Sequence, residues 1–481
     1  MSETFTAPIR VKVGAVVGFL VFVELTSGFI QGYYLPLIAA IAGHLSVSDA
    51  DITWFATLQT LAAGVSVPIL SKLGDIFGHR RVLRIAIAVV LVGTLLIALA
   101  PNFTLVLVGR VLMGPLAVWL PLEVALVHNR ITGETARKAI GMLVAALTIG
   151  ALIGGLAAGA LGTAIPNLLV VLMIPAVIVA VCLVIVWTLV PESTIRTNPK
   201  IDVLGFVLLA LFMLALLSGL RLAQTVGFAD AATVALLVGA VILIVVFVVW
   251  ELRAKVPAVN IRLIASRALW PVYLTAFVFG MVLFGTQTLI TTFLAADPSV
   301  NGYGFALVPG TLSLFTAGSA LLGAIGASTF AFLARGIGMR NVLLAGVLLN
   351  IVGNGVLALL HDSLPAVIAA FVVNGLGSGL LLGALPALVA ELAPADETGI
   401  AAGVYNSLRT LGGAVAGAVF GVVLASFLVP ATHASSVGGY ATVWTVCASL
   451  FVLAFIALLF QRSPQRHAAG APARVGEKVS A

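Results

Sequence analysis

Charge is scarce in this sequence. Of its 481 residues only 9% are Asp, Glu, Lys or Arg, whereas 62% are hydrophobic. A water-soluble chain carries charge on roughly a quarter of its residues. A soluble enzyme, a disordered protein and a nucleic-acid binder therefore all fit poorly, and the composition predicts a membrane protein.

Residues that carry metal or covalent chemistry are also few. The two cysteines, Cys182 and Cys447, lie in separate apolar stretches and give neither a disulfide framework nor metal-ligand spacing. The six histidines are scattered, and no phosphate-cradling Gly-Lys-Ser/Thr motif is present. We therefore expect no enzyme active site, no metal, no cofactor and no ATP coupling within this chain.

Long hydrophobic runs make up most of the chain. A hydrocarbon core takes about 20 apolar residues per helix, and fourteen runs of this kind are separated by charged or turn-rich segments. The first run is too long for a signal peptide. The sequence predicts an all-α polytopic membrane protein with fourteen transmembrane helices. The predicted spans are 13–38, 52–72, 82–100, 104–127, 139–161, 167–189, 203–220, 231–250, 270–293, 306–332, 342–360, 365–390, 399–425 and 440–460.

The basic residues segregate to one side of these spans. With the N-terminus placed inside, all of the 24 lysines and arginines except Arg110, Arg221 and Arg409 fall in inner segments. Short cytoplasmic loops are enriched in Lys and Arg, so we expect both termini to be cytoplasmic and the protein to lie in the cell (inner) membrane. The net charge of +7 is then a topology signal, and we expect no nucleic-acid partner.

Two segments recur at nearly the same distance along the chain. The loop 73–83 recurs with changes at 333–343, and glycines 141, 150, 155 and 159 fall on glycines 403, 412, 417 and 421. This predicts two duplicated six-helix halves with an inserted central helix pair, and a substrate site at the interface of the halves. The predicted segments are a cytoplasmic N-terminus 1–12, an N-terminal half 13–189, two linker helices 203–250, a C-terminal half 270–460 and a disordered cytoplasmic tail 461–481.

The loop after the second span resembles the signature of a known family. The stretch from Ser71 to Arg81, SKLGDIFGHRR, is similar to the Gly-x-Leu-Ala-Asp-Arg-x-Gly-Arg-Lys motif of the major facilitator superfamily. Arg110-Val-Leu-Met-Gly is similar to its Arg-x-x-Gln-Gly motif, and Glu24-Leu-Thr is similar to the Asp-x-Thr of its drug exporters. With fourteen spans, the chain resembles the drug:proton antiporter branch over about residues 13–460.

The fifth span carries a glycine pattern that supports this resemblance. Gly150, Gly154, Gly155 and Gly159 are spaced as in the antiporter motif Gly-x-x-x-Gly-Pro-x-x-Gly-Gly, with Gly155 in place of the proline. The resemblance associates that proline with a stiff, sealed helix. Glycines four apart allow close helix approach in lipid, so packing explains them as well as transport does.

A carboxylate among guanidinium groups follows the second span. Asp75 beside Arg80 and Arg81 can latch neighbouring helices in one conformation, and breaking the latch would permit rocking of one half against the other. The alternative is a tight turn with solvated charges. Gly78 serves the turn under either interpretation.

Four ionisable residues fall inside spans, where a charge costs at least about 2.5–3.5 kcal/mol. We expect Glu24 and Arg110 to lie at similar heights on adjacent helices, with Glu24 as the proton-coupling carboxylate and Arg110 tuning its proton affinity. A static ion pair is the alternative. Glu123 fits a substrate-entry site, or a side chain that snorkels to the interface. Arg409 lies deep in the thirteenth span, where bonding to backbone carbonyls at a helix crossing is the alternative to a substrate role.

A drug site is apolar and aromatic with few polar groups. We therefore predict secondary transport, with export of lipophilic, cationic compounds in exchange for protons by a monomer in contact with membrane lipid. A proton symporter that imports a small metabolite is the alternative. The substrate-site candidates are Gln31, Tyr34, Trp119, Glu123, Asn374 and Arg409.

Overall fold

The computed structural model describes residues 13–128, 133–190, 202–255, 257, 259, 261–393, 398–429 and 434–461. Within these residues the chain is helical, apart from loops and one isolated bridge between Leu428 and Ser435. The N-terminal segment 1–12 and the tail after Gln461 lie outside the described residues. The predicted all-α fold is confirmed.

Fourteen helical spans are long and apolar enough to cross a bilayer, which confirms the predicted number. The helices of the described chain are α1 (Val13–Tyr33), η1 (Leu35–Leu37), α2 (Ile38–Leu45), α3 (Asp49–Phe77), α4 (His79–Leu99), α5 (Phe103–Leu112), η2 (Gly114–Val118), α6 (Trp119–His128), α7 (Gly133–Ala164), α8 (Leu168–Thr188), α9 (Val203–Val226), α10 (Ala231–Arg253), α11 (Ile261–Ile264), α12 (Trp270–Gly285), α13 (Gln287–Ala295), α14 (Pro298–Asn301), α15 (Pro309–Ile337), α16 (Met339–Leu360), α17 (Leu364–Leu392), α18 (Thr398–Ser426) and α19 (Val437–Leu459).

The first span is longer than predicted. Its helix α1 begins at Val13, as predicted, but the span continues to Leu45 and not to 38, because the chain passes from α1 through the short 3-10 turn η1 into α2. Pro36 lies in this turn, where its missing N–H and fixed φ break the α-helix without ending the span. The fourth span is interrupted in the same way at η2, which contains Pro115.

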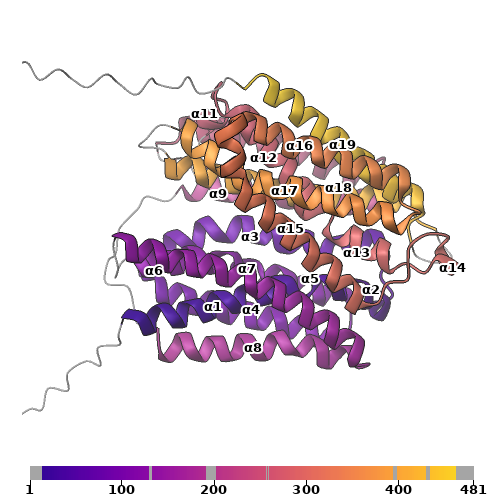
Figure 1. The fold of residues 1–481 in the computed structure, drawn as a ribbon, viewed down its shortest axis with the longest axis horizontal. Helices are drawn as coiled ribbons and strands as arrows, with labels where there is room; N and C mark the ends of the chain where they lie inside the picture. Colours follow the sequence, from indigo (N-terminus) through magenta and orange to yellow (C-terminus); the bar gives the residue numbers. More distant parts are fainter. Residues whose placement is uncertain are drawn as a thin grey trace, which may run out of the picture.

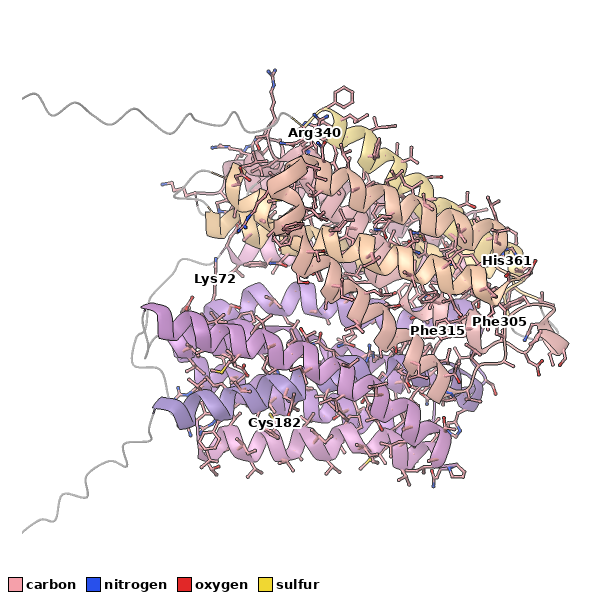
Figure 2. The ribbon with its side chains drawn as sticks, in the orientation of Figure 1. Lys72, Cys182, Phe305, Phe315, Arg340 and His361 are labelled. Atoms are coloured by element: carbon pink, nitrogen blue, oxygen red, sulfur yellow. The ribbon has the colours of Figure 1, made fainter. Side chains whose placement is uncertain are left out.

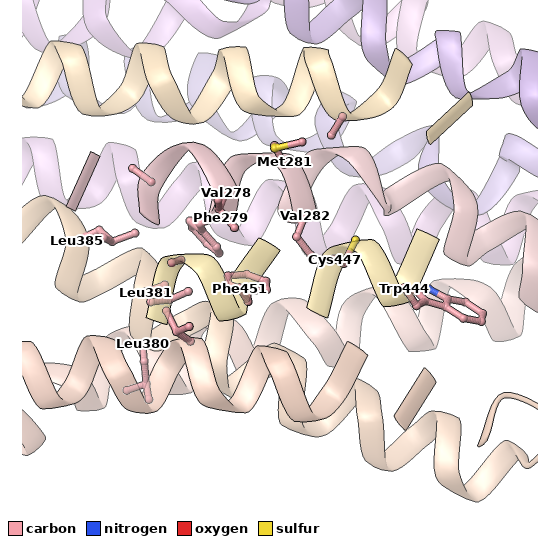
Figure 3. Packing of buried hydrophobic residues seen from close by; sticks show 14 of the residues in the cluster. Val278, Phe279, Met281, Val282, Leu380, Leu381, Leu385, Trp444, Cys447 and Phe451 are labelled. Carbon is pink, nitrogen blue, oxygen red and sulfur yellow. The ribbon is translucent and has the colours of Figure 1, made fainter. Parts of the chain in front are cut away.

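The helices form two groups, which lie one above the other in Figure 1. Buried apolar side chains from α1 to α8 make one cluster, and those from α12 to α19 make another. We call these the first and second groups. Figure 3 shows the second cluster, in which Phe279, Leu381 and Phe451 bring α12, α17 and α19 together.

Helix α1 begins and α19 ends at the same end of the molecule (Figure 1). We call this the proximal end and the opposite one the distal end. Figure 2 places Arg340 at the proximal end of the second group and His361 at its distal end. Successive spans therefore alternate in direction between these two ends.

The repeated loops at the proximal end have the same backbone and make the same contact. Gly78 and Gly338 have φ of 106° and 85°, values that favour glycine, and each joins two helices. Arg80 donates to the carbonyl of Trp187 at the end of α8 (2.6 Å), and Arg340 donates to the carbonyls of Leu458 and Leu459 at the end of α19. Each arginine thus satisfies carbonyls that a helix end leaves unpaired, which agrees with the predicted duplication; the boundaries of the halves stay a prediction.

The two groups meet along two helix pairs in their distal portions. Helix α3 packs against α18, and α7 packs against α15. Gly417 of α18 lies against Thr57 of α3. The backbone N–H of Gly310 on α15 donates to the hydroxyl of Thr163 on α7 at 2.9 Å. In the proximal portions, the positions of Gly141 and Gly336 on α7 and α15 face open space.

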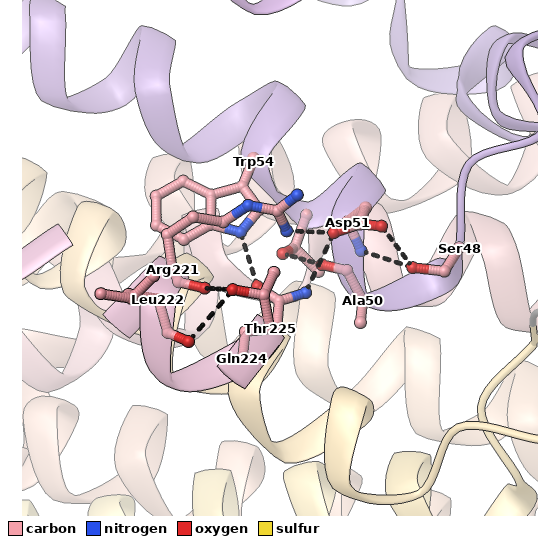
Figure 4. Close-up of polar contacts among 9 residues, drawn as sticks. Ser48, Ala50, Asp51, Trp54, Arg221, Leu222, Gln224 and Thr225 are labelled. Atoms are coloured by element: carbon pink, nitrogen blue, oxygen red, sulfur yellow. Dashed lines mark hydrogen bonds and ion pairs between the residues drawn. The ribbon is translucent and has the colours of Figure 1, made fainter. Parts of the chain in front are cut away.

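Helix α9 of the central pair lies on this seam. Its Met213 and Leu217 share a buried cluster with Trp54 of α3 and Ala418 of α18. Figure 4 shows its polar end, where Arg221 pairs with Asp51 of α3. The central pair therefore contacts both groups through one helix.

Within the first group, α1 and α7 approach so closely that their backbones touch. A Cβ added at Gly150 would overlap the carbonyl oxygen of Leu25, and one at Gly154 would overlap that of Phe29. Gly28 of α1 faces Leu147 in the same way. These glycines therefore set the distance between α1 and α7, whereas Gly155 meets nothing closer than 3.6 Å.

Replacement of Gly154 by Ala is expected to destabilise the fold, while Gly155→Ala is tolerated. A methyl group at residue 154 has to separate two backbones, and overpacking costs about 1–3 kcal/mol. Thermal unfolding of the purified variants in detergent measures the difference. Equal melting temperatures for the two variants would contradict the packing role assigned to Gly154.

Candidate functional site

A polar cluster is buried inside the first group. It contains Glu24, Thr26 and Ser27 on α1, Glu123 on α6 and Cys182 on α8, all at most 2% exposed. Thr26 donates to the carbonyl of Phe22 one turn earlier. Figure 2 shows Cys182 within this group, well away from the second.

The two carboxyl groups of the cluster face each other. Glu24 and Glu123 interact across the interface of α1 and α6. Neither oxygen of Glu123, nor Oε2 of Glu24, makes a hydrogen bond of ordinary geometry with a described residue. Glu123 is fully buried, so the predicted snorkelling to the interface is wrong.

Arg110 does not pair with Glu24, contrary to the predicted placement. Arg110 lies against Tyr34, which is ten residues beyond Glu24 toward the distal end of the same span. At 1.5 Å per residue this is a difference in height of roughly 15 Å. The prediction placed the two groups closer in height because it measured Arg110 from the outer boundary of a core about 30 Å thick, whereas the fourth span has 25 residues and is longer than that core.

The guanidinium of Arg110 is held by α3 instead. Its Nε donates to the carbonyl of Phe55 at 2.7 Å, and its Cζ lies 4.0 Å from the ring centre of Phe55 and 5.4 Å from that of Tyr34. The arrangement joins α5 to α3 through one hydrogen bond and one cation–π contact, and to Tyr34, the residue between α1 and η1, through a second cation–π contact.

The predicted latch residues lie at the proximal turn but contact other partners. Asp75 accepts from His79 at 3.0 Å, one turn away, and Arg80 caps α8 as described above. Arg81 is exposed and Gly78 makes the turn with its positive φ. The contacts described above for Asp75 and Arg80 lie within the first group, so a latch between the groups stays a prediction.

The predicted substrate residues are not gathered in one place. Tyr34 and Trp119 are buried in the first cluster, and the hydroxyl of the former and the indole N–H of the latter lack a described partner. Gln31 is exposed and donates to Ser27 at 3.2 Å. Asn374 accepts from Asn354 on the neighbouring helix at 3.4 Å.

Arg409 lies where α18 crosses α12. Its side chain donates to Asn406 at 3.4 Å and lies near the rings of Tyr405 and Phe284. Its own carbonyl touches Gly280 of α12. Among the described residues, the guanidinium contacts these side chains, and no bond to the backbone carbonyls of the alternative interpretation is present.

A cross-group contact that the sequence did not reveal lies at the distal end. Asp49, the first residue of α3, accepts hydrogen bonds at one oxygen from the hydroxyl of Tyr440 (2.8 Å), the N–H of Ser435 (3.1 Å) and the hydroxyl of Tyr303 (3.4 Å). All three donors belong to the second group. We call these four residues the distal lock. In the sequence, Asp49 looks like an ordinary acidic residue at the start of a helix. Its role in joining the two groups follows only from partners that are distant in the chain.

A second set of polar contacts joins α3 to α9 of the central pair. Gln224 of α9 accepts from the indole of Trp54 at 2.8 Å, and Arg221 forms an ion pair with Asp51 (Figure 4). Arg221 is the one basic residue that falls neither in an inner segment nor within a predicted span, and Asp51 balances its charge. A pocket of about 200 Å³ lies beside the lock and is lined by Asp49 and Tyr303.

The sequence profile of the Major Facilitator Superfamily matches residues 20–417 and 272–480. The chain belongs to this superfamily. Its members are transporters and not enzymes, as the sequence predicted. The fourteen spans fit the fourteen-span drug antiporters of the superfamily.

Two curated superfamily relatives differ in what they carry. The chain is 28% identical over 401 residues to the tetracenomycin C resistance and export protein of Streptomyces glaucescens, covering 80% of this chain and 71% of that one. It is 26% identical over 415 residues to the uridine/deoxyuridine transporter of Lactococcus lactis, covering 84% of each.

A solved superfamily structure shares the fold. The bacterial homologue of the human lysosomal transporter Spinster superposes with a TM-score of 0.67 at 15% identity, covering 93% of this chain and 96% of that one. The fold is thus that of the superfamily.

Replacement of Asp49 by Leu is expected to open the distal end. Loss of three hydrogen bonds, each worth about 0.5–1.5 kcal/mol, shifts the balance toward the open form by at least about tenfold. Labelling of a Ser313→Cys reporter, buried between α7 and α15, by a membrane-impermeant maleimide measures the opening.

Asp297→Asn serves as the control for this experiment. Asp297 is also distal, but it bonds within its own turn to Ser299. Labelling is expected to stay low in that variant. If both variants label alike, or if Asp49→Leu labels like the unmodified chain, Asp49 does not hold the distal end closed.

Proposed function

We propose that the protein exports lipophilic, positively charged organic compounds in exchange for protons. The observation that carries the proposal is an acidic site in the membrane: Glu24 and Glu123 are buried there without an arginine partner. Ionisable groups at such depth mark proton or ion pathways. The named export function of the Streptomyces relative supports the same direction of transport.

We further propose that the proximal end is cytoplasmic, since the inner segments hold nearly all of the Lys and Arg. The described contacts between the groups are distal, so the conformation would be closed to the outside and open toward the cytoplasm. Alternating access then requires the distal lock and the α7–α15 contact to break while proximal contacts form. The proposed setting is the cell membrane, with the monomer as the working unit.

Import of a small polar metabolite with protons is the second candidate. It is favoured by the relative named as a uridine/deoxyuridine transporter, which matches most of the chain. The amides Asn350, Asn354 and Asn374 of the second group could face such a substrate only after rearrangement, because the first two are buried and bond to α16 and α17.

Single cysteines are expected to report opposite sides of the membrane. Asn341→Cys, at the exposed proximal start of α16, is expected to react with an impermeant maleimide only in inside-out vesicles. Asn167→Cys, at the exposed distal start of α8, is expected to react only in intact cells. The reverse pattern would overturn the proposed orientation. The native thiols of Cys182 and Cys447 are buried and give a low background.

Cells that express the protein are expected to accumulate less ethidium, and a protonophore is expected to abolish this difference.

The Glu24→Gln variant, whose residue 24 cannot ionise, is expected to lose proton-driven efflux, while Glu24→Asp retains part of it at a shifted pH. Ethidium fluorescence in cells and inside-out vesicles measures both. Uptake of a radiolabelled nucleoside with no effect on ethidium would favour the import function.

A further inference from the structure

The buried acidic pair of the first group is an unusual arrangement. Glu24 is 1% exposed and Glu123 is not exposed at all. Two ionised carboxylates in contact inside a low-dielectric interior repel strongly, and each alone is costly to bury. The pair therefore needs a positive charge or a proton close by.

No basic side chain supplies this charge among the described residues around the pair. The groups that act on it from α1, α6 and α8 are the two carboxyls themselves and the thiol of Cys182, which also interacts with Thr26. Arg110 is occupied by Phe55. From α4, His79 bonds to Asp75. The side chains of α7 before Ala139 and that of His128 lie outside the described residues.

The unpartnered oxygens show what the site lacks. Both oxygens of Glu123 and Oε2 of Glu24 are buried without a hydrogen bond of ordinary geometry. Buried polar atoms of this kind are rare and call for an occupant. One proton on one carboxyl gives a donor for the other, lowers the charge of the pair from −2 to −1, and satisfies two of these oxygens at once.

We propose that Glu24 and Glu123 form one proton-binding site in which the two carboxyl groups share a proton. This rests on the proposed proton exchange and adds Glu123 as a second proton-binding residue, in place of the predicted substrate role. Proton binding converts a carboxylate pair and a hydronium ion into a carboxyl–carboxylate pair and water. Release reverses this step when another cation or water reaches the pair.

A route to the pair follows one face of α1. Glu24, Ser27 and Gln31 are spaced by three and four residues, so they lie on the same helix face. Gln31 is exposed and donates to the hydroxyl of Ser27, which is buried one turn from Glu24. The stripe leads from an exposed amide to the buried acid, and a proton can pass along it through water and the serine hydroxyl.

Infrared difference spectroscopy of the reconstituted full chain tests the shared proton without any substrate. Near neutral pH, the unmodified protein is expected to show a protonated-carboxyl C=O band. Glu24→Gln and Glu123→Gln are each expected to shift that same band, because the remaining buried carboxyl keeps a proton but loses its carboxylate partner, and the double variant is expected to lose it. Glu123→Asp is expected to keep a band at a shifted frequency.

Two internal controls accompany this measurement. Glu251→Gln replaces a buried glutamate of α10 that accepts from the N–H of Val259, outside both groups, and it is expected to leave the band unchanged. The S–H band of Cys182 is expected to shift in both single variants, whereas that of Cys447, buried in the second group, does not move.

Two results would overturn the shared site: separate bands that each disappear in only one single variant, or no protonated-carboxyl band at all. Ethidium-driven proton release in proteoliposomes is then compared in the same variants and is expected to fall to background in both. A shared band without ethidium-driven release would refute the proposed export and leave the site intact. Release that is normal in Glu123→Gln would refute the site and leave export intact.

A variant of Ser27 tests the proposed proton route along α1. Ser27→Ala is expected to keep the carboxyl band but slow its exchange after a pH jump, because it removes the hydroxyl between Gln31 and Glu24. Unchanged exchange in Ser27→Ala would exclude this route.

Discussion

Neutralisation of buried charge is the constraint on which the rest of this structure depends. An ionised side chain within hydrocarbon costs at least about 2.5–3.5 kcal/mol, so each of the few acids and bases inside the membrane needs a partner. Arg110 is met by a backbone carbonyl and two rings, and Asp49 by two tyrosine hydroxyls and an N–H from the second group. In both cases the protein itself supplies the partner. Glu24 and Glu123 differ, because among the described residues the main charged neighbour of each is the other acid.

Close backbone contact makes each group rigid and leaves the seam as the place where movement can occur. Gly150 and Gly154 let α7 touch α1, and Gly412 lets α18 touch α12 in the same way, against the carbonyl of Phe277. The seam is held by different contacts: small residues, the Gly310–Thr163 hydrogen bond and the distal lock. Hydrogen bonds of this kind contribute about 0.5–1.5 kcal/mol each, so the seam can open while packing within each group persists.

The fold was largely predictable from the sequence, whereas the partners of the site residues were not. Fourteen apolar runs identify fourteen spans because a bilayer fixes the length of a helix that crosses it. The predicted pairing of Glu24 with Arg110 depended on heights within a core about 30 Å thick, but the fourth span has 25 residues and is longer than that core. Asp49 was missed because its donors Tyr303 and Tyr440 are about 250 and 390 positions away in the chain. Periodicity locates a helix, but it carries no information about which distant side chain faces it.

The acidic pair lies wholly inside the first group, and this limits how its proton can be exchanged. Rocking of rigid groups changes distances across the seam but not the distance between α1 and α6, which belong to the same group. A mechanism that pulls Glu24 away from Glu123 is therefore less direct than one that changes access to them. The face of α1 that carries Ser27 and exposed Gln31 offers such access. Since the second group has no matching pair of buried acids among its described residues, the proposed proton exchange depends on access to this one pair along α1.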